Sequence, residues 1–226
     1  MSKKEGKKHD ELENVEHALT ASEAFIEKYQ KQILISVATV VLVVLAVLAF
    51  QNFYQAPREI AAENEMYKSQ ALFATDSFRV ALEGNGGQAM GFKEIVSEYG
   101  MTTSGNLAAA YAGICYFKLG QYDNAIKYLS QYDGEDTYFT SSIVGLTGDC
   151  YVELGETSKA ISYFDKAADL ENTILSPVYL KKAGLVYESL KEPAKAEKEY
   201  TAIKEKYPKS PEAAEMDKYL ARVQGN

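Results

Sequence analysis

The stretch LAAAYAGICYFKLGQYDNAIKYL, residues 107–129, decides the fold, because its pattern returns 35 residues later as SIVGLTGDCYVELGETSKAISYF, residues 142–164. Small residues and tyrosines occupy the same slots in both copies. The matching pairs are Gly113 and Gly148, Tyr116 and Tyr151, Gly120 and Gly155, Ala125 and Ala160, and Tyr128 and Tyr163. Self-similarity at a fixed period of this length predicts helical hairpins that stack on their neighbours.

A third copy, VYLKKAGLVYESLKEPAKAEKEY, fills residues 178–200, one residue later than the period requires. Its Gly184, Tyr187 and Ala196 fall in the slots of the first two copies. Lys191 stands where those copies have a glycine, so we expect the third turn between helices to differ from the other two. The three copies together predict three consecutive hairpins.

The recurring residue types have a physical reason. Glycine in the first helix and alanine in the second let two backbones approach closely, and tyrosine rings fill the remaining space. A glycine after the first helix suits the left-handed conformation that ends many helices. The pattern resembles the tetratricopeptide repeat, a helix–turn–helix unit, in copies at 106–140, 141–176 and 177–209. The resemblance implies an all-α solenoid of helical hairpins.

Segments on both sides complete the predicted solenoid. Upstream, small or apolar residues recur every three or four positions from Pro57 to Glu83, which predicts one long amphipathic helix. Downstream, Ser210 and Pro211 form the typical start of a helix. The predicted repeat domain covers 57–226, with a degenerate hairpin at 57–100 and a cap helix at 211–223.

A long uncharged segment precedes this domain. Residues 33–50, ILISVATVVLVVLAVLAF, contain no charged side chain, and a helix of about 20 apolar residues crosses a bilayer core. A buried core helix would show a polar stripe, and a cleavable signal peptide would have a shorter apolar run. We therefore expect a single transmembrane helix at 33–54, with Phe53 and Tyr54 at the membrane–water boundary.

Lysines on the two sides of this segment predict its orientation. Six lysines precede it, whereas Arg58 and Lys68 are the basic residues that follow it most closely. Positive charge favours the cytoplasmic side of a membrane. We expect the N-terminal tail, residues 1–32, to lie in the cytoplasm and the repeat domain to lie outside it.

The tail has its own pattern. Its apolar residues follow a seven-residue repeat from Leu12 through Leu19 and Ile26 to Ile33, interrupted by Ser22. Such a pattern predicts an amphipathic helix that pairs with a partner or with a second copy. An interfacial or solvated lead-in to the membrane helix is the alternative.

Composition excludes several classes of function. The chain carries 24 Lys and Arg against 32 Asp and Glu, a net charge of −8, which argues against nucleic acid as a partner. Its two histidines, His9 and His17, lie in the tail, so the repeat domain lacks the usual general base and metal ligand. Nucleotide-binding motifs are absent from the sequence. We expect no enzyme activity, no cofactor, no metal and no small-molecule substrate.

Two features could suggest other chemistry. Asp133, Glu135 and Asp136 form a carboxylate cluster, which we interpret as a solvated turn between hairpins. Cys115 and Cys150 lie one repeat period apart, and equivalent positions on stacked helices are usually too distant for a disulfide. We expect two buried packing cysteines.

The resemblance to tetratricopeptide repeats also implies a binding surface. In such stacks the first helix of each hairpin lines a concave face. The corresponding positions here are Leu107, Ala110, Ile114 and Phe117, then Ser142, Gly145, Asp149 and Val152, then Val178, Lys181, Leu185 and Glu188. Relatives that grip a terminal carboxylate need Lys and Asn at such positions, whereas this chain has Ala110 and Ile114. Its face suits an apolar or amphipathic protein segment, unless a neighbouring hairpin or the cap helix covers it.

The whole architecture resembles the YfgM family: a short cytoplasmic tail, one span and an external stack of degenerate tetratricopeptide hairpins. That resemblance implies a protein of the bacterial inner membrane with its repeat domain in the periplasm. It also implies a non-catalytic accessory subunit of the Sec translocon, with translocon subunits, a periplasmic chaperone or client segments as partners. A scaffold for outer-membrane or cell-wall assembly is the alternative, because such scaffolds use the same repeats.

Overall fold

The computed structural model describes residues 27–225, which contain helices and no strand. A single isolated β-bridge joins Gly84 and Met90 in this range. The chain divides into two compact units, one ending at Ala56 and the other beginning at Pro57. The all-helical fold predicted from the sequence is confirmed. Residues 1–26, which carry most of the predicted amphipathic tail, lie outside the described range.

The described part of the first unit, residues 27–56, is helical and has no buried side chain. Residues 27–49 are α-helical, and Phe50–Gln55 form a π-helical segment, η1. The apolar side chains of this unit are exposed, with Phe53 reaching 84%. The helical run Glu27–Ala74 is long and apolar enough to cross a membrane. By length and composition it therefore fits the span predicted at 33–54.

The π-helical segment lies directly before Pro57. There the backbone N–H of Ala56 donates to the carbonyl of Gln51, five residues earlier, rather than four. Proline has no N–H and clashes with the carbonyl of the preceding turn in a regular α-helix. A wider π turn is a common adjustment of a helix that continues past such a point.

The second unit begins with three helices, α2 (Ala56–Ala74), α3 (Phe78–Glu83) and α4 (Phe92–Tyr99). The single helix predicted from Pro57 to Glu83 is wrong, because the chain turns between α2 and α3. Asp76 adopts a positive φ of 56° there, and the Ser77 N–H donates to the Leu72 carbonyl at 3.1 Å. A glycine-rich turn separates α3 from α4, with Gly84, Gly86 and Gly87 all at positive φ.

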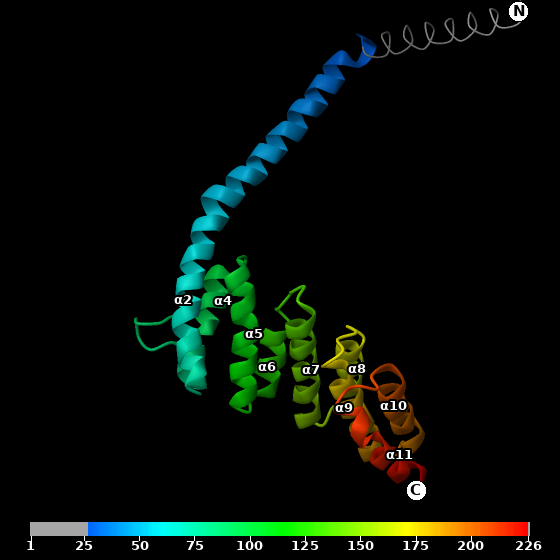
Figure 1. Ribbon diagram of the computed structural model, residues 1–226. Helices are drawn as coiled ribbons and strands as arrows, with labels where there is room; N and C mark the ends of the chain where they lie inside the picture. Colours follow the sequence, from blue (N-terminus) through cyan, green and yellow to red (C-terminus); the bar gives the residue numbers. More distant parts are fainter. Residues whose placement is uncertain (1–26, 226) are drawn as a thin grey trace, which may run out of the picture. The chain divides into compact units, whose positions relative to one another are not determined.

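Three hairpins follow, and Figure 1 shows them side by side in chain order. The first two are α5 (Thr103–Lys118) with α6 (Tyr122–Leu129), and α7 (Thr137–Glu153) with α8 (Thr157–Ala168). The third is α9 (Ser176–Ser189) with α10 (Pro193–Lys206). The chain then forms a short 3-10 helix, η2 (Ala213–Glu215), and α11 (Met216–Gln224), so the predicted final helix starts later than Pro211.

Each hairpin is held together at the predicted glycine. A Cβ at Gly113 would lie 2.5 Å from Leu129 Cγ, one at Gly148 would lie 2.6 Å from Phe164 Cε1, and one at Gly184 would lie 2.3 Å from Tyr200 Cε1. In every case the contacted side chain belongs to the second helix of the same hairpin. These glycines are therefore the points of closest approach between paired helices, as the repeat pattern predicted.

The three turns within hairpins have the same geometry, so the prediction that the third would differ is wrong. Gly120 and Gly155 have φ of 72° and 73°, and Lys191 has φ of 59°. In each turn the residue at positive φ donates its N–H three residues back, at 2.9 Å. The repeat geometry thus imposes a left-handed conformation on a lysine, which costs an L-residue about 1 kcal/mol.

Replacing Lys191 with glycine should therefore raise the free energy of unfolding by about 1 kcal/mol, because glycine adopts this conformation without a Cβ clash. The measurement is urea unfolding of the full chain in detergent, followed by circular dichroism. Lys191→Ala is the matched control, since alanine keeps the Cβ, and its stability should stay close to that of the original chain. Equal stabilisation by both variants would contradict a backbone origin.

Both cysteines are free and fully buried, Cys115 on α5 and Cys150 on α7. Burial raises the pKa of each thiol to about 12. Thiolates are the reactive form of cysteine, so these side chains serve packing.

Candidate functional site

The predicted concave row begins on α5, where its residues are largely covered. Ala110 is fully buried and does not reach the solvent. Leu107, Ile114 and Phe117 are half-buried and pack against a hydrophobic core that extends from α2 to α7. Phe117 also meets Tyr122 edge to face, with ring centroids 5.7 Å apart. This part of the row is mainly structural.

On α7 and α9 the polar members of the row are engaged within the protein. Asp149 accepts two hydrogen bonds from the ammonium of Lys182, at 2.8 and 2.7 Å. Lys181 forms an ion pair with Glu215 of η2. Gly145 is covered by Tyr179, whose ring would lie 2.0 Å from an added Cβ. A partner cannot use these groups without displacing their present contacts.

Glu188 lies in a small charged network with the last helix. Its carboxylate accepts hydrogen bonds from Arg222 at 2.8 and 2.6 Å, and from the hydroxyl of Tyr200. Burial opposes ionisation of Glu188, but the hydrogen bonds from Arg222 and Tyr200 outweigh it and lower its pKa. Burial and the same carboxylate raise the pKa of Tyr200.

The last helix, α11, contacts α9 at nearly the same sequence separation at which α9 contacts α7. The contact between α7 and α9 joins Asp149 and Lys182, 33 residues apart, and Glu188 pairs with Arg222, 34 residues apart. Met216 and Val223 of α11 are buried in a cluster with residues of α10. Thus α11 takes the position of the first helix of a fourth hairpin and caps the stack, as solenoids require.

Two apolar members of the row remain open. Val152 of α7 is 41% exposed and Leu185 of α9 is 42% exposed. Val178 is half-buried. The two exposed side chains come from neighbouring hairpins and stand on helices rather than loops. We call these two residues the concave pair, because they are the exposed apolar side chains of the predicted row.

Sequence reasoning missed an anchor that joins α2 to the first hairpin. The Glu59 carboxylate accepts hydrogen bonds from the backbone N–H groups of Thr103 at 2.7 Å and Ser104 at 2.9 Å, the first turn of α5. Thr102 caps the same helix by accepting from the Gly105 N–H. Arg58 donates to the carbonyl of Glu98 and lies over the Tyr99 ring. A carboxylate at a helix N-terminus is favourable, but nothing in the local sequence pairs Glu59 with residues so distant.

This anchor predicts a pH-dependent loss of stability. Burial opposes ionisation of Glu59, but the hydrogen bonds from Ser104 and Thr103 prevail and lower its pKa below 4.5. Its contribution is therefore present above the unfolded-state pKa and is lost as the pH falls through the folded-state pKa. Glu59→Gln should cost about 1–2 kcal/mol near pH 7 and much less in acid.

Unfolding of both chains across the acidic range measures this difference. Glu63→Gln, on the exposed side of the same helix, is the control and should change stability little at any pH. A gap between original and Glu59→Gln chains that stays constant with pH would contradict the electrostatic account.

Within residues 27–225 no group of His, Cys, Asp and Glu side chains has the arrangement of a metal site. The carboxylate cluster is exposed, as predicted for a turn, and Asp136 caps α7 by accepting from the Phe139 N–H at 2.7 Å.

Comparison with known proteins agrees with this architecture. One model of the tetratricopeptide repeat matches residues 111–133 and 180–210, and a second model of that repeat matches 145–173. No curated protein matches the chain in sequence.

Solved structures show the same fold. A tetratricopeptide repeat protein from Parabacteroides merdae superposes with a TM-score of 0.58 at 21% identity, covering 73% of this chain and 60% of that protein. The chain thus spans less than two thirds of that relative. MamA protein gives a TM-score of 0.57 at 19% identity, covering 73% of this chain and 82% of MamA.

The chain is therefore an all-helical solenoid of tetratricopeptide type with one long apolar helix near its N-terminus. Repeats of this type imply a module that binds other proteins.

Proposed function

We propose that this protein is a membrane-anchored, non-catalytic interaction subunit. It works beside the Sec translocon and holds a chaperone or an emerging client at the periplasmic face of the inner membrane. The concave pair, Val152 and Leu185, is the observation that carries the binding role, because both are exposed apolar side chains on neighbouring hairpins. The uncharged helix before the solenoid supports the anchoring role.

The rigidity of the surface also favours binding. The helices that carry the concave pair are fixed by buried residues such as Ile143 and Val186. A surface that needs no reordering retains more of its contact energy on binding. Apolar side chains in this setting suit the apolar face of a helix or an extended apolar segment.

In-cell photo-crosslinking from position 152 or 185 tests this proposal. Capture of translocon subunits, a periplasmic chaperone or exported clients would support it. Capture of outer-membrane or cell-wall assembly factors would select the scaffold alternative instead. A probe at exposed Lys118 serves as the control for random contacts.

Orientation has a separate test. A reporter that works only outside the cytoplasm, fused after Asn226, should be active, because the tail lysines favour a cytoplasmic N-terminus. The matched fusion to a reporter that works only in the cytoplasm should be inactive. The reverse result would place the solenoid in the cytoplasm and exclude a periplasmic role.

A further inference from the structure

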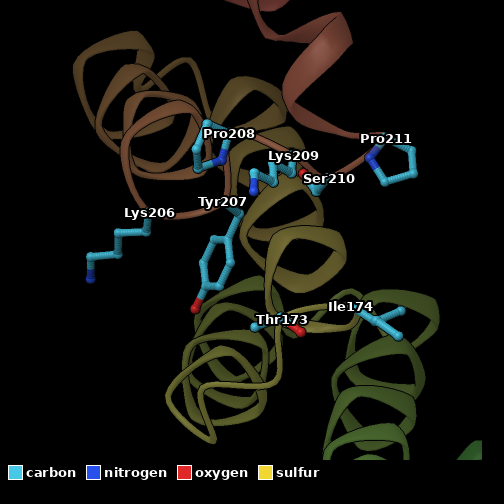
Figure 2. Close-up of a pocket in the computed structure, with 8 residues that line it drawn as sticks. All are labelled: Thr173, Ile174, Lys206, Tyr207, Pro208, Lys209, Ser210 and Pro211. Carbon is cyan, nitrogen blue, oxygen red and sulfur yellow. The ribbon is translucent and has the colours of Figure 1, made fainter.

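A cleft lies at the edge of the solenoid, away from the concave pair. It has a volume of about 440 Å³ and separates the loop between α8 and α9 from the loop between α10 and η2. Figure 2 shows Tyr207 reaching from the second loop toward Thr173 of the first, with Ile174 farther along the same loop. Clefts of this size accommodate a few side chains of a peptide.

The walls of this cleft are apolar and its borders are basic. Ile174 is 61% exposed, and the rings of Pro208 and Pro211 contribute further apolar surface. Lys206 and Lys209 also line the cleft and are exposed. Such a combination favours a ligand with an apolar group next to a negative charge.

The two lysines differ in their surroundings, because the positive charge of Lys206 also interacts with the carboxyl group of Glu199. Neither forms an ion pair with any residue in the described range 27–225, whereas nearby Lys204 pairs with Asp217 at 2.5 Å. Free positive charge is notable in a chain with a net charge of −8. A chain with this net charge repels acidic partners, so such a partner gains from a place where two exposed ammonium groups stand outside direct ion pairs.

Local hydrogen bonds shape both loops. Asn172 accepts from the N–H groups of Ile174 at 2.9 Å and Leu175 at 3.0 Å. On the other loop, the Ser210 N–H donates to the Tyr207 carbonyl at 2.9 Å, and the Ser210 hydroxyl accepts from the Ala213 N–H at 3.1 Å. The cleft is therefore formed in advance, and little ordering entropy opposes binding.

Each loop also carries a buried polar atom without a hydrogen-bond partner. One is the side-chain amide nitrogen of Asn172, which directly precedes Thr173, and the other is Glu212 Oε2, which directly follows Pro211. Buried polar groups normally have partners. Neither residue lines the cleft, so these two atoms belong to the interior of the loops and not to the binding surface.

We propose that this cleft binds an acidic, apolar segment of a protein partner, with Asp or Glu side chains at Lys206 and Lys209 and an apolar side chain between Ile174 and Tyr207. This second site is independent of the concave pair and does not require the translocon role.

The test uses the full chain in detergent and an array of octapeptides that combine Glu or Asp with Leu or Phe. A matched array replaces the acids with Gln and Asn, and a third consists of the same apolar residues with free acetate added. The original chain should bind the acidic peptides, and binding should weaken with salt. The double variant Lys206→Glu with Lys209→Glu should reduce affinity at least tenfold, which is about 1.4 kcal/mol.

The control variant Lys118→Glu with Lys218→Glu changes the net charge equally at exposed positions outside the cleft, and it should bind normally. Ile174→Ser should weaken binding without removing its salt dependence. Absence of any preference for the acidic peptides would overturn the proposal. So would equal losses in the cleft and control variants, or equal binding of the amide peptides.

Discussion

Replacing Gly148 with leucine is expected to lower the free energy of unfolding by about 3 kcal/mol, because overpacking a dense contact costs about 1–3 kcal/mol and leucine adds four carbon atoms. The first of these, Cβ, would already lie 2.6 Å from the Phe164 ring and 3.3 Å from the Ala160 carbonyl oxygen. Phe164 is only 1% exposed and its ring stacks on Tyr179, so it cannot swing into solvent. The damage should extend from the second hairpin to the third.

Urea unfolding of the full chain in detergent measures this loss. Lys159→Leu, on the exposed side of α8, is the control and should shift stability by less than about 1 kcal/mol, since it loses an exposed ion pair with Glu156. If the two substitutions cost the same, then Gly148 is not a point of close approach and the register of the repeats is wrong.

The repeats could be predicted from the sequence because the contacts that hold each hairpin together depend on residue size, which the sequence shows directly. Gly148, which has no side chain, lies against the large side chain of Phe164. The same pairing of a glycine with a large residue recurs at the same spacing in Gly113 with Leu129 and in Gly184 with Tyr200. A local pattern of this kind can be recognised in a single sequence without an alignment. The turn at Lys191 could not be predicted in this way. The preferences of lysine indicated a turn unlike the other two, but the neighbouring helices impose the same positive φ that Gly120 and Gly155 adopt.

The binding surface was less accessible to prediction. Slot positions identify which side of a helix faces the concave surface, but they do not reveal how much a neighbouring element covers it. Phe117 occupies such a slot and yet packs against the core. Likewise the pairing of Lys181 with Glu215, and of Glu188 with Arg222, depends on where α11 docks, which no local pattern specifies.

These contacts decide how the concave surface should be tested. Substituting Phe117 would disturb the core and confuse loss of binding with loss of folding. Val152 and Leu185 avoid this difficulty because about two fifths of each side chain is exposed. Val80 and Leu190 provide a control of the same two residue types, with exposures of 36% and 40%, outside the concave row.

The double variant Val152→Asp with Leu185→Asp should reduce partner capture about tenfold or more while leaving the melting temperature nearly unchanged. Burying one aliphatic side chain contributes up to about 1.5–3 kcal/mol, and a half-exposed one contributes less, so two together exceed the 1.4 kcal/mol of a tenfold change. An introduced carboxylate adds a desolvation cost when a partner covers it.

Capture is measured by affinity purification of the partner that crosslinking identifies. Val80→Asp with Leu190→Asp should retain capture, because it adds the same charge at similar exposure elsewhere. If the control loses as much as the concave variant, general acidity explains the effect. If the concave variant binds normally, the partner contacts another surface, and exchanging residues 1–50 for an unrelated anchor would show whether the membrane helix and tail provide it.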